Sequence, residues 1–389
     1  MNKQPPVGGL LNVYKPRGWS SFHIVALLRR LTGIKRIGHA GTLDPFAEGV
    51  LPILIGRSTR LLSYMDDDLK HYRVILVPGA DTATQDIVGE VLRVREADEA
   101  WIGALSENDY AAVRRSLAAM TGTSEQMVPL YSAVKVDGRP LYDYARQGIE
   151  PPRRPSRMIT VERAELATAF RAEDPGIGLS DTQLQAIEDL LAAEAPGQQR
   201  GEFGRLDLEP AEGLPRPAMA LVIDFSVSKG TYIRTLCAKL GEEWNTGAYA
   251  YRLQRLEAGN MKSTDAALPE ELSGARDEAA EEGEPSFAPW LAPWWRGADG
   301  AVSGLPMLEL EDQEAIRLTH GQRLSLKAAE PRLAELLPAI EAAQDQPAMT
   351  AGACLAGRLI GTVRLERNQS DHVIVTTERM IATREDLQC

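Results

Sequence analysis

The chain has 389 residues, of which 44% are hydrophobic and 25% charged, and its formal net charge is −12. A chain of this length is expected to fold into two or three domains with well-packed cores. It has no run of about 18 apolar residues and does not begin with an apolar segment behind a basic one, so we expect neither a membrane-spanning helix nor a secretory signal.

The amino-terminal segment is basic. Residues 1–36 contain no acidic residue and seven basic ones: Lys3, Lys15, Arg17, Arg29, Arg30, Lys35 and Arg36. The sequence predicts a strand over Gly9–Tyr14, a turn over Lys15–Gly18, and a helix capped by Ser20 or Ser21. This helix has apolar residues at helical spacing and ends at Gly33. Such a charge cluster is usually a solvated surface, but one beside a candidate site fits contacts with phosphates.

The stretch Arg36–Gly56 predicts a rigid loop that presents one carboxylate. Gly38 and Gly41 permit backbone geometries closed to other residues, and Pro45 fixes its own φ and biases Asp44 away from the helical region. The apolar run Val50–Ile55 is typical of a buried strand, which would anchor the loop. An Asp-Pro pair in a glycine-rich loop is usually only a turn.

The middle of the chain alternates predicted strands and helices. We expect a short helix over Ser58–Met65, two strands over Tyr72–Pro78 and Ile87–Arg95, and a helix over Ser106–Met120. Met127–Tyr142 predicts a loop, a strand, a tight Asp-Gly turn and the start of a helix.

An acidic segment interrupts this pattern. Met158–Leu166 predicts a strand, after which residues 166–216 carry 10 acidic and 4 basic residues and include one amphipathic helix over Ser180–Ala195. This insertion is interpreted either as a partner-docking arm or as a solvated excursion, since long surface loops cost little. The regular pattern resumes with a strand over Ala218–Ser228, a helix ending near Trp244, and a strand over Ala248–Glu257.

A second acidic segment, residues 264–304, predicts a linker. Residues 264–300 carry 9 acidic and 2 basic residues, and without both acidic segments the chain has 37 basic against 36 acidic residues, so its net charge does not exclude a nucleic-acid partner. Trp290, Trp294 and Trp295 in the linker could stack on RNA or pack on the domain surface. From Leu305 the sequence predicts a folded domain, with apolar strand-like runs at Cys354–Leu365 and His372–Thr377.

Cysteines and histidines are scattered. Cys237, Cys354 and Cys389 are far apart and odd in number, which argues against a disulfide framework and for a reducing, cytoplasmic location. The five histidines show no zinc-ligand spacing, so no metal is expected. The sequence has no phosphate-binding loop and no dinucleotide fingerprint, so we expect no cofactor.

Several motifs together resemble the TruB family of pseudouridine synthases. The loop signature Gly38–Pro45 followed by Gly49–Pro52 is the longest, and Lys15-Pro16, Lys70–Tyr72, Met127–Tyr142 and Lys229–Leu236 follow in the family's order. The resemblance implies an α/β (α+β) fold with a mixed, largely antiparallel sheet. It also implies a catalytic domain over residues 1–263, interrupted by the insertion 166–216, and a small PUA-like β domain over residues 305–389, where the similarity is weaker.

The resemblance also assigns roles to individual residues. It implies that Asp44 is the catalytic aspartate, that Arg234 pairs with it, and that Tyr72 stacks on the displaced base. Substrate-binding roles are implied for Lys15, His39, Tyr232 and Leu253, with His39 filling the place of a flipped nucleotide. Without the motifs, Lys15 would be interpreted as an ordinary turn lysine and His39 as a loop histidine. Tyr72 would be a strand tyrosine and Leu253 a core leucine.

The expected reaction needs no redox input. Conversion of uridine to pseudouridine breaks the bond from C1′ to N1, rotates the uracil and joins C1′ to C5, and an ionised aspartate can serve without an activating base. Whether Asp44 attacks the sugar, attacks the uracil ring or assists glycal formation stays open. Glu48 stands where the family usually has a small hydroxyl residue, and Ala83 replaces an aspartate; both departures concern substrate contacts.

We therefore expect a monomeric tRNA pseudouridine synthase that modifies position 55 in the T-loop without a protein partner. A noncatalytic RNA-binding or tRNA-folding factor using the same cleft is the alternative from another class. A guide-RNA-dependent synthase is the alternative among enzymes, although the chain lacks obvious basic tails.

Overall fold

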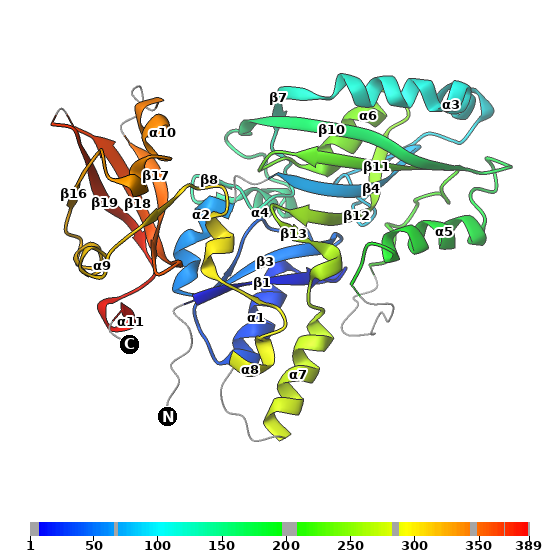
Figure 1. The fold of residues 1–389 in the computed structure, drawn as a ribbon. Helices are drawn as coiled ribbons and strands as arrows, with labels where there is room; N and C mark the ends of the chain where they lie inside the picture. The colour runs from blue at the N-terminus through cyan, green and yellow to red at the C-terminus, as the bar shows by residue number, and fades with distance from the viewer. Residues whose placement is uncertain are drawn as a thin grey trace.

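A computed structural model describes residues 8–65, 69–196, 208–281, 288–342, 348–368 and 370–387. Figure 1 shows a large sheet with helices packed around it and a smaller sheet formed by the last part of the chain. The large sheet has ten strands, in the order β14-β1-β3-β12-β4-β11-β10-β7, with β2 paired to β3 and β13 to β12. Its strands are β1 (Gly8–Lys15), β2 (Ile37–His39), β3 (Glu48–Gly56), β4 (Lys70–Pro78), β7 (Gly122–Met127), β10 (Ser156–Arg171), β11 (Met219–Val227), β12 (Ala248–Ala258), β13 (Met261–Lys262) and β14 (Trp295–Arg296).

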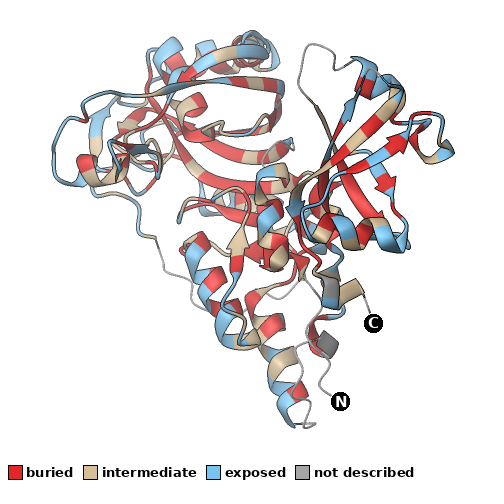
Figure 2. Ribbon diagram, turned by 90° about the vertical axis from the view of Figure 1, so that its left-hand side faces the viewer, coloured by how far each residue is buried: buried red, intermediate tan, exposed pale blue. Residues whose placement is uncertain are grey.

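The strand pairing agrees with the predicted fold class. The pairs within the large sheet are antiparallel, except that β3 lies parallel to β12. Two small hairpins stand beside it, one of β5 (Ala80–Thr82) and β6 (Val91–Val94) and one of β8 (Lys135–Val136) and β9 (Arg139–Pro140). Figure 2 shows buried residues running along the strands of both sheets. The sheets therefore contribute most of the cores, which is typical of this layered architecture.

The predicted first helix is confirmed with both of its caps. Helix α1 (Ser21–Thr32) follows Ser20, whose hydroxyl accepts a hydrogen bond from the His23 amide, and it ends at Gly33, whose φ is 71°. A residue in this left-handed conformation at a helix end is usually glycine, because glycine has no Cβ to clash. The predicted helix ending near Trp244 is also present, as α6 (Ile233–Glu243).

The predicted helix over Ser106–Met120 was wrong at its start. Helix α3 (Glu99–Ala119) begins after Asp98, whose carboxylate accepts from the Trp101 amide, whereas the Ser106 hydroxyl donates back to the Ile102 carbonyl inside the helix. The backbone leaves helical geometry from Glu107 to Tyr110. The capping signal at Ser106 was therefore misread, because Asp98 caps the first turn and the Ser106 hydroxyl bonds back to Ile102 instead of capping the amides that follow it.

Three predicted strands differ in extent. Within Ile87–Arg95 only Val91–Val94 is a strand, because the Asp86 carboxylate accepts from the Val88 amide and holds a turn there. β10 continues to Arg171, paired with Met219, so the chain leaves the sheet later than residue 166. The run Cys354–Leu365 spans a hairpin: β17 (Met349–Leu355) turns at Ala356 and Gly357 into β18 (Arg358–Arg367).

The acidic segment 264–304 packs against the large sheet. It forms α7 (Pro269–Glu281) and α8 (Ala288–Leu291), and then supplies the edge strand β14, which pairs with β1. Trp290, Trp294 and Trp295 pack into an apolar cluster with residues of β1 and α1. Trp295 lies over Gly9, where any Cβ would clash with its ring. Packing on the domain surface, one of the two interpretations of these tryptophans, is confirmed.

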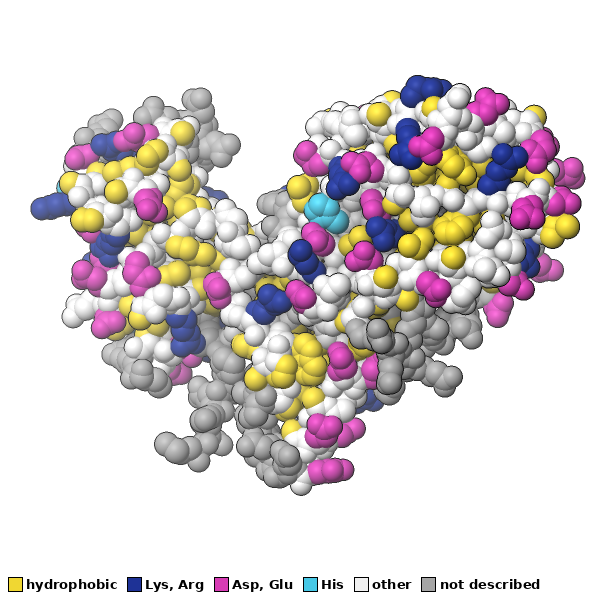
Figure 3. Space-filling view, turned by 45° about the vertical axis from the view of Figure 1, so that its right-hand side comes forward, with side chains coloured by type: hydrophobic (Ala, Val, Ile, Leu, Met, Phe, Trp, Pro, Cys, Tyr) yellow, Lys and Arg dark blue, Asp and Glu magenta, His cyan; other side chains and the backbone are white. Residues whose placement is uncertain are grey.

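The carboxy-terminal sheet has five strands in the order β15-β17-β18-β19-β16. Its further strands are β15 (Met307–Glu309), β16 (Leu324–Lys327) and β19 (His372–Met380), and its helices are α9 (Asp312–Thr319), α10 (Leu337–Ala342) and α11 (Arg384–Leu387). An apolar cluster joins it to the large domain, and Tyr64, in α2 (Leu62–Met65), donates to Glu378 at 2.9 Å. Figure 3 shows the surface hollowed between the two domains. No helix in the described part of the chain is long and apolar enough to cross a membrane.

Candidate active site

The loop that carries Asp44 is held on both sides of this residue. The Ser21 hydroxyl, on the first turn of α1, accepts from the Leu43 amide at 3.0 Å and donates to the Leu43 carbonyl at 3.2 Å. The Gly18 amide donates to the Pro45 carbonyl at 2.7 Å. The Asp44 side chain is 36% exposed, so solvent and a ligand can reach its carboxylate. The predicted rigid loop presenting one carboxylate is therefore what the structure shows.

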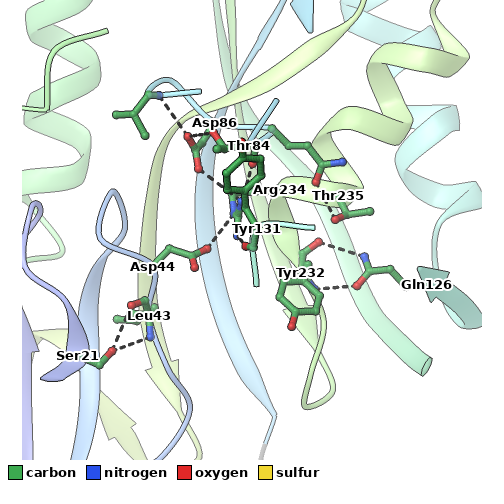
Figure 4. A network of polar contacts seen from close by, with 12 residues as sticks. Ser21, Leu43, Asp44, Thr84, Asp86, Gln126, Tyr131, Tyr232, Arg234 and Thr235 are labelled. Carbon is green, nitrogen blue, oxygen red and sulfur yellow. Dashed lines mark hydrogen bonds and ion pairs between the residues drawn. The ribbon is translucent and has the colours of Figure 1, made fainter. Parts of the chain in front are cut away.

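Arg234 lies against this carboxylate, as the resemblance implied. Its Nε is 2.8 Å from Asp44 Oδ2, although the arginine itself is 3% exposed. The rest of the guanidinium donates to the carbonyl oxygens of Thr84 and Tyr131 and lies 3.6 Å from Asp86. Figure 4 shows Arg234 reaching from the start of α6 between Asp44 and Asp86. A planar guanidinium held at four points fixes the direction in which Asp44 points.

Asp86 completes the buried side of this pair. Its carboxylate accepts from the Thr84 hydroxyl at 2.5 Å and the Val88 amide at 3.2 Å. Burial raises the pKa of Asp86, and the charge of Arg234 partly opposes this rise. Asp86 thus balances the charge of Arg234 on the buried side, while Asp44 meets it on the open side.

Tyr72 reaches the same loop through Arg255. Arg255, in β12, is 1% exposed; it donates to the Tyr72 hydroxyl at 3.4 Å and to the Gly41 carbonyl at 2.8 Å. The φ of Gly41 is +67°, and a Cβ there would lie 3.1 Å from the Arg255 guanidinium. Glycine is therefore required both for the turn and for the close approach of Arg255. Arg255 thereby links Tyr72 to the loop that carries Asp44.

Lys15 braces the loop from inside. Its side chain is fully buried, and its ammonium donates to the carbonyl oxygens of Pro16, Trp19 and Ala47 at 3.0, 2.6 and 2.5 Å. Burial lowers the pKa of Lys15 to about 7, against the opposing effect of the Glu48 and Asp44 carboxylates. These contacts use every proton of the ammonium group, so the structure gives Lys15 a role in supporting the loop.

The three other predicted substrate-binding residues lie at different distances from this centre. His39 ends β2, paired with Ile53, shortly before Asp44 in the chain. Tyr232 precedes α6, and its backbone exchanges two hydrogen bonds with the Gln126 side chain (Figure 4). Leu253 is 5% exposed in the core cluster that also contains Leu43 and Tyr72. Their roles toward a substrate stay predictions.

The sequence analysis missed the charged residues buried around the site. Arg252 and Arg255 lie in the predicted strand over Ala248–Glu257 and are 4% and 1% exposed. Two arginines three residues apart in a mostly apolar strand were a signal for such contacts, because a charge buried by the strand's packing needs partners. Glu48, noted only as a departure from the family, pairs with Arg252 at 2.8 Å.

The described residues form no cluster of metal ligands. Among the residues with described positions, no three histidine, cysteine, aspartate or glutamate side chains are placed to hold a metal ion. The expectation that the reaction uses no cofactor remains a prediction.

Comparison of the sequence with known proteins gives one consistent family. A family pattern described as "TruB family pseudouridylate synthase (N terminal domain)" matches residues 29–177. The tRNA pseudouridine synthase B of Streptococcus gordonii is 32% identical over 345 residues, covering 87% of this chain and 97% of that protein. Those of Ralstonia pickettii and Moorella thermoacetica are 34% and 36% identical over 85% and 70% of this chain, and over 84% and 72% of their own lengths.

Solved structures share the fold at lower identity. A chain of an H/ACA RNP bound to a substrate RNA containing 2′-deoxyuridine superposes with a TM-score of 0.58 and 15% identity, covering 97% of this chain and 87% of that one. A chain of a Cbf5-Nop10-Gar1 complex gives a TM-score of 0.58 and 17% identity, with coverage of 97% and 86%. At these identities the likeness establishes the arrangement of the two sheets.

Proposed function

Because this chain belongs to the TruB family of pseudouridine synthases, we propose that it converts the uridine at position 55 in the T-loop of tRNA to pseudouridine. Relatives at least 32% identical over most of the chain carry the name tRNA pseudouridine synthase B, which supports tRNA as the substrate. The observation that carries the proposal is the exposed Asp44 carboxylate held 2.8 Å from the buried Arg234 guanidinium.

The proposed catalytic group is Asp44. The isomerisation breaks the bond between C1′ and N1, turns the uracil, joins C1′ to C5, and finally moves the hydrogen of C5 to N1. Each route open from the sequence, through the sugar, the uracil ring or a glycal, needs one free carboxylate at the nucleotide. Asp44 fits because its backbone is fixed by Ser21 and Gly18 while its side chain stays accessible.

Arg234 and Tyr72 would shape the pocket for an extruded base. Arg234 orients the carboxylate and contributes a positive charge where the substrate approaches. Tyr72 offers an aromatic face beside the Asp44 loop, on which a uracil can stack. The target lies within a folded loop, so the base must leave its stack to reach Asp44. His39, a short distance before Asp44 in the chain, is proposed to fill the vacated place.

The segment from Met127 to Arg157 is proposed to contact the RNA backbone. It carries three acidic residues and six basic ones: Lys135, Arg139, Arg146, Arg153, Arg154 and Arg157. It adjoins the site because the Tyr131 carbonyl accepts from Arg234. Arg157 also stacks 5.7 Å from the Tyr232 ring. Basic side chains interleaved with aromatic rings suit phosphates and unstacked bases.

We propose further that the protein works as a monomer in the cytoplasm, without a guide RNA or protein partner. The relatives that support this match over 85% or more of this chain and are named as tRNA enzymes, whereas the ribonucleoprotein chains share the fold at 15–17% identity. The carboxy-terminal domain, PUA-like in its position and its small curled sheet, would then grip the acceptor end of the same tRNA.

Mapping of pseudouridine in an unmodified tRNA transcript tests the function directly. The purified protein should produce pseudouridine at position 55, and a matched transcript with cytidine at that position should bind equally and gain none. Binding of both transcripts with no product from either would replace this proposal with a tRNA-folding factor. Product at another position would refute the choice of the T-loop while keeping the enzyme.

A further inference from the structure

The large sheet has a narrow junction beside the candidate active site. Among the described strands, β1, β2, β3 and β14 join the rest of the sheet through the parallel pairing of β3 with β12. That pairing aligns just two residue pairs, Glu48 with Gln254 and Gly49 with Arg255. Asp44 precedes β3, whereas Arg234 belongs to the other side of the junction. The Asp44–Arg234 separation therefore depends on how β3 is held against β12.

A buried arginine bridges this junction. Arg252 of β12 donates from one terminal nitrogen to Glu48 at 2.8 Å and from the other to Glu188. The side chains of Arg252, Glu48 and Glu188 are 5%, 9% and 29% exposed. Burial acts to lower the pKa of Arg252, but the two carboxylates outweigh it and raise that pKa. Two carboxylates on separate nitrogens fix the orientation of a guanidinium, which one carboxylate alone does not.

Glu188 comes from the inserted acidic segment. It lies on α5 (Asp181–Ala192), the helix predicted over Ser180–Ala195, and this helix begins with a capping box at Ser180. Ile187 and Leu191 are buried in the main core cluster on the same helix. Helix α5 of the inserted segment is therefore docked on the domain core and is not a solvated excursion.

Polar contacts connect the end of α5 to β12 and β4. The Gln254 side-chain amide of β12 donates to the Leu191 carbonyl at 3.0 Å and to the Tyr14 hydroxyl of β1 at 3.0 Å. Glu194 lies 3.5 Å from Arg73 of β4. Helix α5 and the residues after it therefore contact β12 and β4, and they reach β3 and β1 through Arg252 and Gln254 of β12.

We propose that Glu188 is a positioning residue for catalysis, which holds Arg252 on Glu48 and thereby sets the place of the Asp44 loop relative to Arg234. The inserted segment then helps to position the Asp44 loop for the reaction. This inference rests on the proposed function, because it concerns the reaction in which Asp44 takes part.

The test compares Glu188→Gln with Asp189→Asn in the intact chain. Both substitutions neutralise one acid on α5, but Asp189 is exposed and its carboxylate accepts from the Gln185 side chain in the same helix. Single-turnover pseudouridine formation on an unmodified tRNA transcript is measured over a range of enzyme concentrations, with thermal unfolding alongside. We expect Glu188→Gln to lower the maximal rate about tenfold, because a small displacement of a catalytic group by a distant change slows the reaction. The half-saturating enzyme concentration, the unfolding temperature and the Asp189→Asn rate should stay at wild-type values.

A double variant separates positioning from general packing. If Glu188 acts through Arg252 on Glu48, adding Glu188→Gln to Glu48→Gln should cost nothing further in rate, whereas independent effects would multiply. Full rate in Glu188→Gln, a change confined to half-saturation, or multiplied losses in the double variant would each overturn this proposal alone. An inactive wild-type protein would overturn the proposed function, and this proposal with it.

Discussion

The Asp44 loop continues directly into β3, whereas the inserted helix α5 reaches the start of β3 through Arg252 of β12, and the two differ in how they are built. The loop is short, its backbone is held by hydrogen bonds with the Ser21 hydroxyl and the Gly18 amide, and it presents its carboxylate to solvent. Helix α5 is distant in sequence, packs through Ile187 and Leu191, and directs its Glu188 carboxylate to a buried arginine. One acid is presented for chemistry and the other stabilises, so an acidic residue's role depends on what surrounds it.

After removal of Asp44 itself, the largest effect on the reaction rate is expected from Arg234→Lys, at the arginine that contacts Asp44. Lysine keeps the charge but cannot contact Asp44, Asp86 and the Tyr131 carbonyl together as the guanidinium does. We expect the single-turnover rate to fall about 100-fold while tRNA binding is retained. Rapid-quench assays measure the rate, with Arg115→Lys at an exposed position of α3 as control. A rate within twofold of wild type would show that fixing the direction of Asp44 is unimportant.

Truncation of a buried side chain in the inserted helix should reduce the free energy of unfolding more than the reaction rate. Leu191 is fully buried in the main cluster, and Leu191→Ala should lower the free energy of unfolding by about 2–5 kcal/mol. Chemical denaturation monitored by tryptophan fluorescence measures it, with Ala192→Gly as a control for helix propensity alone. A loss below about 1 kcal/mol would mean that α5 is not docked on the sheet as described.

The fold was predictable where local signals decide it and not where distant contacts do. Ser20 and Gly33 delimit α1 because their caps are local, and the motif around Asp44 led directly to its loop. The start of α3 was misjudged because Asp98 and Ser106 both offer capping oxygens, and only the folded chain selects one. The partnership of Glu188, Arg252 and Glu48 joins residues far apart in sequence, which no spacing rule indicates. Composition identified the inserted segment as acidic but said nothing about the arginine it meets.

The buried Lys15 beside the Asp44 loop should make the free energy of unfolding depend on pH. Lys15 has an ordinary pKa of 10.5 when unfolded and about 7 in the folded protein. Between these values the unfolded chain binds more protons, so the free energy of unfolding contributed by Lys15 rises with pH, and below pH 7 this gain is absent. Relative to Lys15→Met, wild type should gain up to about 1.4 kcal/mol per pH unit in that range. Urea unfolding of wild type and Lys15→Met from pH 6 to pH 10 measures this difference in unfolding free energy. A difference that does not change with pH would contradict a lowered pKa for the buried Lys15.

The smallest effect is expected at Glu194, near the end of the inserted helix. Its pair with Arg73 spans 3.5 Å, its side chain is 38% exposed, and Arg73 keeps Asp224 at 2.8 Å as a partner. Exposed pairs of this kind contribute roughly 0–1 kcal/mol, so Glu194→Gln should change both the unfolding free energy and the rate little. Thermal unfolding and the single-turnover assay check this, and a tenfold rate loss would show that the positioning effect assigned to Glu188 is a general property of acids on this segment.

The most direct test of the whole account is single-turnover pseudouridine formation by Asp44→Asn, at enzyme concentrations that saturate an unmodified tRNA transcript. Asparagine preserves the size of the side chain and removes the charge that the reaction requires. We predict that the variant binds the transcript as wild type does and forms no detectable pseudouridine, while Asp189→Asn reacts at the wild-type rate. Substantial product from Asp44→Asn with binding unchanged would contradict the assignment of Asp44 as the catalytic group.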